Sequence, residues 1–235
     1  MDAAEIGYEA MDAEDYGRAL AAFEKAVELC PNYPIYWYDV ARTQREIGSY
    51  QSALTAIDIA IKLDESEPQF RHARGNIMRS LNNLEEAVDE FKRALDLDES
   101  FPAHNNLGLT YHDLGELDLA RDVLEQGLNF APEDTDLLMN LASVYCDMDK
   151  FAVAALYDER VVRLNPNIVR SWERLANDYF CLKQFDQAEV AMREAIARGH
   201  DTAEAYSVLG DILLSAGKVE EAKVAFEIAH SRSHQ

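Results

Sequence analysis

The sequence has few of the residues that interrupt helices, with only ten glycines and six prolines among 235 residues. An all-β chain needs more of both for its many tight turns. Hydrophobic residues make up 48% of the chain and charged residues 28%, a balance that indicates a folded rather than a disordered polymer. The composition therefore predicts a globular protein built of helices.

Long apolar runs and paired cysteines are also missing. No run approaches the roughly 18 residues that a membrane-spanning helix requires, and residues 1–5 lack the basic start of a secretory signal. The cysteines Cys30, Cys146 and Cys181 are odd in number, far apart and not spaced as metal ligands. We expect them to be reduced cysteines of a cytoplasmic protein.

Basic side chains are scarce, with 22 lysines and arginines against 44 aspartates and glutamates, which gives a formal charge of −22. An acidic surface of this kind repels phosphate backbones and anionic lipid headgroups. We therefore expect neither a nucleic acid nor a membrane as a partner of this protein.

No group of residues resembles a catalytic, cofactor or metal site. His104 and His112 lie eight residues apart on one predicted helix, whereas a zinc helix of the His-Glu-x-x-His type needs its histidines one turn apart. Asp96, Asp98 and Glu99 have no glycine where a calcium loop requires one. Phosphate-binding loops, nucleophile elbows and Cys-x-x-Cys pairs do not occur in the sequence. The sequence predicts a protein that is not an enzyme and has no catalytic residue, metal ligand or cofactor.

What the sequence does contain is a repeat of 33 or 34 residues. A small residue recurs at this spacing at Ala19, Ala53, Ala87, Ala120, Ala154, Ala188 and Ala222. Mostly apolar residues recur three positions before it and four and seven positions after it, so they share one face of a helix. A second amphipathic helix lies upstream in each repeat. Turn-forming residues are expected between the two helices at Gly17, Gly48, Asn82, Asn83, Gly115, Asp149 and Gly217.

This pattern resembles the tetratricopeptide repeat (TPR), in which Trp-x2-Leu-Gly-x2-Tyr is followed by Ala-x3-Phe. The sixth repeat, for example, has Trp172, Leu175, Ala176 and Tyr179 in these positions, followed by Ala188. The resemblance covers essentially the whole chain. It implies an all-α, right-handed α-solenoid of seven helix-turn-helix hairpins that forms a single domain over residues 1–235. The repeats are expected near 1–33, 34–67, 68–100, 101–134, 135–168, 169–202 and 203–235.

Asp158 departs from this pattern because it stands where a phenylalanine or tyrosine normally packs. A buried carboxylate without a partner is costly. Either a donor compensates Asp158, or its helix is locally rotated or exposed. We favour a paired, structural Asp158 over a functional one.

The TPR resemblance also implies a concave groove lined by the first helix of each repeat. In the second to fourth repeats its inward-facing residues are expected to be Tyr38, Arg42, Arg45, His72, Asn76, Arg79, Asn105, Leu109 and His112. Three of these nine are arginine and none is acidic. We hypothesise that they bind an acidic peptide or a free C-terminal carboxylate, which guanidinium groups can hold through two parallel hydrogen bonds.

Other interpretations of these positions stay open. Arg42 can instead pair with Asp39 or Glu46 on its own helix, which would use its charge locally. Asn106 and Asn140 occupy equivalent inward positions in successive repeats and resemble part of the asparagine ladder with which some TPR proteins hold a peptide backbone. The corresponding rows of the later repeats are more apolar and contain Met139, Cys146, Phe180 and Leu214.

The function implied by the resemblance is that of a non-catalytic scaffold or adaptor that binds a protein or peptide ligand in its groove. One alternative is a structural subunit that forms a homo-oligomer through its C-terminal helix, because no polar capping helix follows the seventh repeat. A second alternative is the docking or regulatory region of a larger enzyme.

Overall fold

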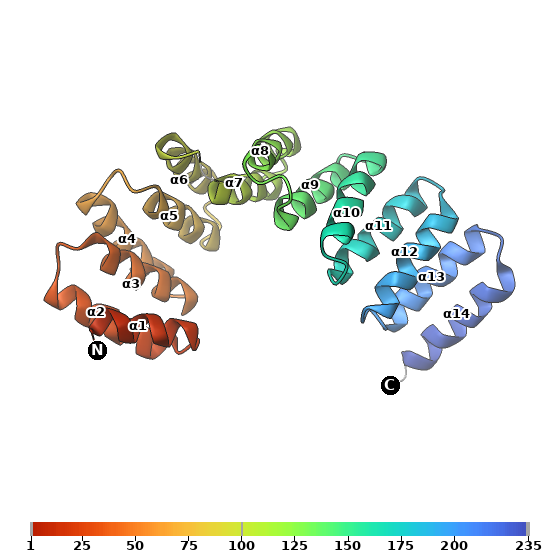
Figure 1. Cartoon of the computed structure of the whole chain (residues 1–235), viewed down its shortest axis with the longest axis horizontal. Helices are drawn as coiled ribbons and strands as arrows, with labels where there is room; N and C mark the ends of the chain where they lie inside the picture. Colours follow the sequence, from red (N-terminus) through yellow and green to blue (C-terminus); the bar gives the residue numbers. More distant parts are fainter. Residues whose placement is uncertain (1, 100, 234–235) are drawn as a thin grey trace. The chain divides into compact units, whose positions relative to one another are not determined.

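The computed structural model describes residues 2–99 and 101–233. Within these residues the chain forms fourteen α-helices and no strand (Figure 1). The helices are α1 (Ala3–Asp12), α2 (Tyr16–Leu29), α3 (Pro34–Glu46), α4 (Tyr50–Leu63), α5 (Pro68–Ser80), α6 (Leu84–Leu97), α7 (Phe101–Asp113), α8 (Leu117–Phe130), α9 (Thr135–Asp147), α10 (Phe151–Leu164), α11 (Val169–Cys181), α12 (Phe185–Ala197), α13 (Ala203–Ser215) and α14 (Val219–Arg232). None of them is long and apolar enough to cross a membrane. The predicted all-α helical-repeat fold is confirmed.

The helices form two compact units, an N-terminal unit (Met1–Glu116) and a C-terminal unit (Leu117–Gln235). In the N-terminal unit, α1–α2, α3–α4 and α5–α6 pack as hairpins, and α7 packs on α6. In the C-terminal unit, α8 packs on α9, and α9–α10, α11–α12 and α13–α14 are hairpins. A single solenoid over all seven repeats, with the boundaries given above, stays a prediction.

One residue with positive φ lies in each turn that follows an odd-numbered helix. These residues are Glu14, Gly48, Asn82, Gly115, Asp149, Lys183 and Gly217. In each turn, the amide of the next residue donates a hydrogen bond to the carbonyl oxygen five positions earlier, for example from Asp15 to Ala10 at 2.9 Å. This backbone bond fixes a left-handed turn at the end of the helix.

Two of these turns differ from the sequence-based expectation. Gly17, expected to mark the first turn, lies inside α2, and Glu14 has the left-handed backbone instead. Lys183 does the same in the turn after α11, where no turn residue was predicted. A side chain in this conformation costs about 1 kcal/mol. The hairpin contacts therefore impose the turn even where the local sequence does not favour it.

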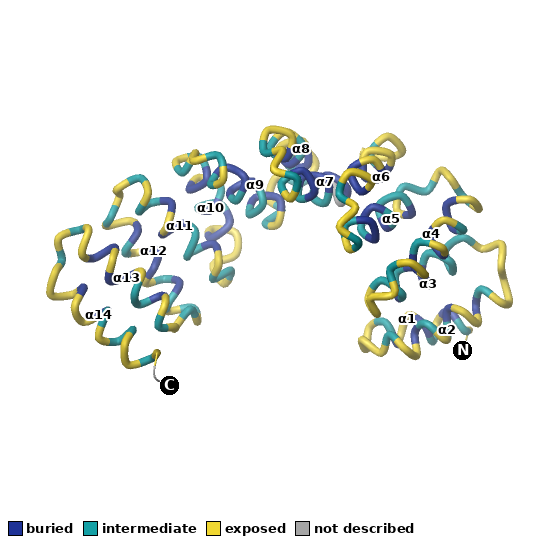
Figure 2. Tube along the Cα trace, turned by 180° about the vertical axis from the view of Figure 1, so that it is seen from behind, coloured by how far each residue is buried: buried dark blue, intermediate teal, exposed yellow. Residues whose placement is uncertain are grey.

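The core of each unit lies between the helices. Every alanine of the 33- or 34-residue series is buried. Figure 2 shows buried positions recurring along the helices among exposed ones, as one apolar stripe per helix requires. Phe23 and Ile57 are fully buried in the N-terminal core cluster, and Met192 and Leu213 are buried in the C-terminal one. The small alanine side chains let neighbouring helices approach closely while these larger residues fill the space between them.

Glycine in the first helix of a hairpin is matched to phenylalanine in the second. A Cβ added at Gly75 on α5 would lie 2.6 Å from the Phe91 ring on α6. The same conflict exists for Gly7 with Phe23 and for Gly210 with Phe226. Where alanine replaces the glycine, the residue sixteen positions later is not phenylalanine, as in Ala41 with Ile57, Ala142 with Asp158 and Ala176 with Met192. In these six repeats phenylalanine is thus found only opposite glycine, whereas the fourth repeat pairs Gly108 with Leu124.

We expect Gly75→Ala to destabilise the N-terminal unit by up to about 2 kcal/mol, because overpacking costs about 1–3 kcal/mol and the gain in helix propensity offsets about 1 kcal/mol of it. Urea denaturation followed by circular dichroism measures this change. Combining Gly75→Ala with Phe91→Ile copies the natural pair Ala41 and Ile57 and should cost less than the sum of the single changes. Strictly additive effects would contradict a direct conflict between the two side chains.

Candidate functional site

The residues predicted to bind a peptide lie on adjacent helices of the N-terminal unit. Within this unit α3 contacts α5, and α5 contacts α7. We call the surface that the predicted residues form on these three helices the first-helix face. The predicted residues on it are Tyr38, Arg42 and Arg45 on α3, His72, Asn76 and Arg79 on α5, and Asn105, Asn106, Leu109 and His112 on α7, and all are partly exposed. Asn140 lies on α9 in the C-terminal unit, so its place beside Asn106 stays a prediction.

Direct contacts join the three helices across this face. The Tyr38 and Phe70 rings, on α3 and α5, have centroids 5.5 Å apart. The side-chain amide of Asn106 on α7 lies 2.6 Å from His72 Nε2 on α5. Which side chain donates in this contact depends on the tautomer of His72. The sequence-predicted residues therefore bind one another as well as facing outward.

A polar pocket of about 560 Å³ opens at the C-terminal ends of α3 and α5. Its lining includes three of the predicted residues, Arg45, Asn76 and Arg79, together with Asp113 at the end of α7. The remaining lining residues are Ser80, Asn82 and Leu84. The pocket thus combines two guanidinium groups, amide groups and a hydroxyl, all of which can form hydrogen bonds with a polar ligand.

Carboxylates partly neutralise the arginines of this pocket. Arg79 Nη2 lies 2.9 Å from Asp113 Oδ2, and Arg45 Nη2 lies 2.5 Å from Glu46 Oε1. Sequence reasoning missed Asp113, although it lies 34 residues after Arg79 and so occupies the equivalent position one repeat later. The face is therefore less cationic than its nine predicted residues suggest.

Arg42 differs from these two arginines. Its guanidinium lies over the Tyr38 ring, 6.0 Å from the ring centroid. Its neighbour Asp39 is buried and accepts a hydrogen bond from the Tyr8 hydroxyl at 2.7 Å. Burial raises the pKa of Asp39, and the Tyr8 hydrogen bond and the charge of Arg42 oppose that rise. Of the two local partners that the sequence left open for Arg42, Asp39 thus interacts with its charge, whereas Glu46 pairs with Arg45.

The C-terminal unit contains a buried ion pair between α10 and α11. Asp158 is fully buried and accepts two hydrogen bonds from Arg174, one of them from Nε at 2.6 Å. The pairing expected for Asp158 is therefore confirmed. Burial raises the pKa of Asp158, and the two hydrogen bonds from Arg174 oppose that rise.

A second buried carboxylate lies beside this pair. Asp178 is fully buried, and its Oδ1 accepts a hydrogen bond from Cys146 Sγ at 3.1 Å. Burial raises the pKa of Asp178 to about 6. The row that contains Cys146 was predicted to be apolar, but in the structure it lies against an ionisable group. Sequence reasoning missed Asp178, although the equivalent positions of other repeats hold the buried residues Ile77, Val144 and Ile212.

Comparisons with known proteins agree with this architecture. A family model described as "Tetratricopeptide repeat" matches residues 5–69 and 173–227. Another with the same description matches residues 101–134, and a model described as "TPR repeat" matches residues 75–115. A curated relative, the small glutamine-rich tetratricopeptide repeat-containing protein 2 of Mycosarcoma maydis, is 46% identical over 44 residues. That match covers 19% of this chain and 12% of the relative.

Solved structures share the fold at low sequence identity. The C-terminal part of a TPR repeat-containing protein from Cytophaga hutchinsonii superimposes with a TM-score of 0.78 at 16% identity and covers 96% of this chain and 92% of its own. YrrB, described as a TPR protein with an unusual peptide-binding site, gives 0.64 at 22% identity and covers 78% of this chain and 95% of its own. MamA gives 0.65 at 22% identity and covers 68% of this chain and 94% of its own. Because a single repeat model matches more than half of its residues, the chain belongs to the tetratricopeptide repeat family.

Proposed function

We propose that this protein is a non-catalytic interaction scaffold whose first-helix face binds a peptide segment bearing an acidic side chain or a free C-terminal carboxylate. The observation that carries the proposal is the polar pocket lined by Arg45, Asn76 and Arg79. Membership of the TPR family and the fold shared with YrrB, a peptide-binding TPR protein, support it.

The chemistry of the pocket suits a carboxylate. A guanidinium has five N–H donors, and Asp113 engages one edge of Arg79. Asp113 thus orients Arg79, while its remaining donors are available to a ligand. Asn76 has both an amide donor and an amide acceptor, which matches the groups of a peptide backbone. The Tyr38 ring lies on the same face and offers an apolar surface for a neighbouring side chain.

The charge of the whole chain adds selectivity. With a formal charge of −22, the protein repels an acidic ligand except where arginines gather. An acidic peptide that reaches the arginines gains strong charge-assisted hydrogen bonds, whereas one that cannot reach them meets only repulsion. Binding is therefore expected to depend on the position of the carboxylate in the peptide and not on its charge alone.

We expect the triple charge reversal Arg42→Glu, Arg45→Glu and Arg79→Glu to weaken the binding of acidic peptides by more than about 100-fold, because it removes at least two charge-assisted hydrogen bonds worth about 1.5–3 kcal/mol each. Fluorescence polarisation with synthetic glutamate-rich peptides measures this loss. Glutamine versions of the peptides and versions with an amidated C-terminus show whether side chains or the terminal carboxylate are recognised.

A matched control is the triple reversal of Arg18, Arg163 and Arg170, which changes the net charge equally and lies on α2, α10 and α11 and not on the three helices of the first-helix face. This control should bind acidic peptides within a few-fold of the unchanged protein. Equal affinity of acidic peptides for the unchanged protein and for the Arg42, Arg45 and Arg79 variant would refute the proposed site.

A further inference from the structure

A second group of arginines lies on a different side of α5. Arg71 and Arg74 are three residues apart and so share one face of the helix. At about 100° per residue, that face lies roughly 140° around α5 from the row formed by His72, Asn76 and Arg79. Arg71 and Arg74 therefore do not belong to the first-helix face but lie on the side of α5 that packs toward α4 and α6.

In most other repeats the positions equivalent to Arg71 and Arg74 are apolar, although the fourth repeat has His104 and Leu107 there. The apolar pairs include Trp37 and Val40, Trp172 and Leu175, and Tyr206 and Leu209. There they line pockets between consecutive second helices, with volumes of about 470, 540 and 190 Å³. The same side of α5 thus has two cations where the repeat normally places an aromatic and a branched residue.

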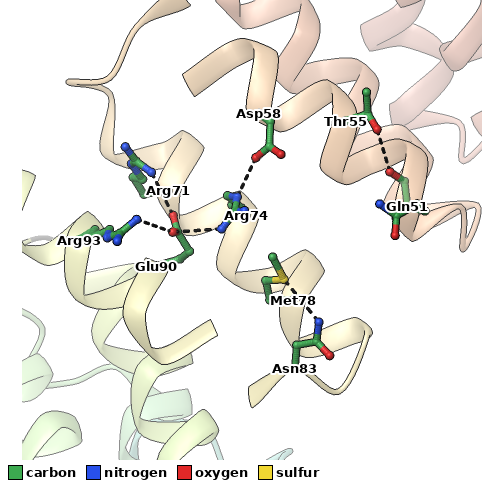
Figure 3. Close-up of polar contacts among 9 residues, drawn as sticks. All are labelled: Gln51, Thr55, Asp58, Arg71, Arg74, Met78, Asn83, Glu90 and Arg93. Carbon is green, nitrogen blue, oxygen red and sulfur yellow. Dashed lines mark hydrogen bonds and ion pairs between the residues drawn. The ribbon is translucent and has the colours of Figure 1, made fainter. Parts of the chain in front are cut away.

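The two arginines and Arg93 of α6 converge on one carboxylate. Glu90 on α6 is 3% exposed, and its oxygens lie 3.4 Å from Arg71 Nη1, 3.1 Å from Arg74 Nη1 and 3.0 Å from Arg93 Nη1. Arg74 Nε also lies 2.8 Å from Asp58 Oδ1 on α4. Figure 3 shows the three guanidinium groups gathered around Glu90, with Arg74 between Glu90 and Asp58. We call Arg71, Arg74, Arg93 and Glu90 the arginine cluster.

The cluster has more positive charge than its buried carboxylate needs. Three guanidinium groups face Glu90 and Asp58, which leaves one positive charge among these five groups in a chain of formal charge −22. A bidentate arginine such as Arg174 is enough to hold the buried Asp158. Glu90 does not account for the third arginine.

The arginines are also accessible. The side chains of Arg71, Arg74 and Arg93 are 20%, 24% and 59% exposed, in contrast to 3% for Glu90 beneath them. Each guanidinium has five N–H donors, and the contacts to Glu90 and Asp58 use one or two of them. Planar donors held close together in a fixed arrangement suit an oxyanion with several acceptor oxygens.

We propose that Arg71, Arg74 and Arg93 form an oxyanion-binding site on the α4–α5–α6 side of the N-terminal unit, for a carboxylate or a phosphate group. Glu90 is the internal anion that the three guanidinium groups share without a ligand, and it competes with the ligand for their charge. The site is separate from the proposed peptide-binding pocket, because different residues and a different face of α5 form it. Its ligand adds charge-assisted hydrogen bonds to the donors that Glu90 leaves unused.

The proposal makes opposite predictions for two variants of the full chain. Glu90→Gln keeps the shape of the side chain but removes the internal anion, so it should bind inorganic phosphate about tenfold more tightly. Arg93→Gln removes the most exposed of the three cations and leaves Glu90 with two arginines, so the fold is retained. It should bind phosphate about tenfold more weakly. A cluster that only stabilises the fold predicts no specific response to the anion in either variant.

The measurement is a titration of the arginine Nε–H resonances in ¹H–¹⁵N spectra with phosphate and, separately, with succinate at constant ionic strength. The site is supported by saturable shifts of the Arg71, Arg74 and Arg93 signals in one or both titrations. The affinity should be highest for Glu90→Gln, intermediate for the unchanged protein and lowest for Arg93→Gln. Comparison of the two titrations identifies which oxyanion the site prefers. Arg121→Gln is the matched control, because Arg121 is also paired with two carboxylates, Asp118 and Asp122. Absence of saturable shifts with both anions, or affinities that the two cluster variants do not change, overturns the proposal.

Discussion

Replacing Arg174 with leucine is expected to destabilise the C-terminal unit by about 3–5 kcal/mol, because it removes the cation that compensates the fully buried Asp158. The loss should be larger at pH 8 than at pH 5, since protonation of Asp158 relieves the uncompensated charge at the lower pH. Urea denaturation at both pH values, followed by circular dichroism, measures the change. We expect it to appear as a lower denaturation midpoint.

The double variant Asp158→Met and Arg174→Leu separates the buried charge from the packing. Replacing a buried ion pair by apolar residues of similar volume is often neutral or stabilising. Methionine is chosen because Met192 occupies the equivalent position opposite Ala176, as Asp158 does opposite Ala142. We expect the double variant to recover to within about 1 kcal/mol of the unchanged protein. If Arg174→Leu alone has little effect, or if the double variant is as unstable as the single one, the ion pair does not stabilise the fold in this way.

Asp158 also illustrates how far the sequence predicts the structure. The spacing of the alanines from Ala19 to Ala222 is enough to predict the helical repeat, because only a regular stack of hairpins buries a small residue at that period. The same pattern predicts that Asp158 needs a partner. It does not identify Arg174, which lies sixteen residues away on the next hairpin. Compensation of a buried charge depends on contacts between helices, and the sequence pattern of either helix alone does not predict these contacts.

The turns show the same limit at the level of the backbone. Glycine at Gly48 or Gly217 marks a turn in the sequence, but Glu14 and Lys183 adopt the same left-handed conformation with no local signal. Hydrogen bonds across each turn and the packing of the hairpin determine the conformation there. A sequence pattern finds such a turn only where the residue itself favours it.

The sequence predicted the basic side chains of the candidate site but not the acidic side chain that pairs with one of them. The groove positions implied by the repeat include Arg45 and Arg79, and both line the polar pocket of the N-terminal unit. The pattern within one repeat does not predict Asp113 as a partner, because its ion pair with Arg79 joins residues one repeat apart. It does not predict the arginine cluster either, because Arg71 and Arg74 on α5 meet Glu90 through contacts between helices.

Replacing Asp178 with asparagine is expected to stabilise the C-terminal unit by about 1–2 kcal/mol at pH 8 and to bring no gain at pH 4.5. Burial raises the pKa of Asp178 to about 6, with the charge of Asp158 adding to the rise and Cys146 and Arg174 opposing it. In the unfolded chain an aspartate has a pKa of about 3.9. Between these values the folded protein binds a proton that the unfolded chain has released, so stability falls as the pH rises from about 4 to about 6 and then levels off.

The two pKa values differ by about 2, which corresponds to a loss of about 2–3 kcal/mol at neutral pH and above. Asparagine cannot ionise and so avoids this loss, although its buried amide then lacks a partner and offsets part of the gain. The Cys146 thiol can still donate to the amide oxygen at residue 178. The variant should therefore exceed the unchanged protein at high pH only.

Urea denaturation midpoints from pH 4.5 to pH 8 test this expectation, with Asp211→Asn as the control that removes an exposed carboxylate from α13. The control should follow the pH dependence of the unchanged protein, whereas Asp178→Asn should show a flatter curve that crosses it. A curve for Asp178→Asn parallel to that of the unchanged protein would mean that Asp178 stays ionised in the fold. In that case Arg174 compensates both buried carboxylates. The Arg174→Leu variant should then lose more stability than the roughly 3–5 kcal/mol expected from its ion pair with Asp158 alone.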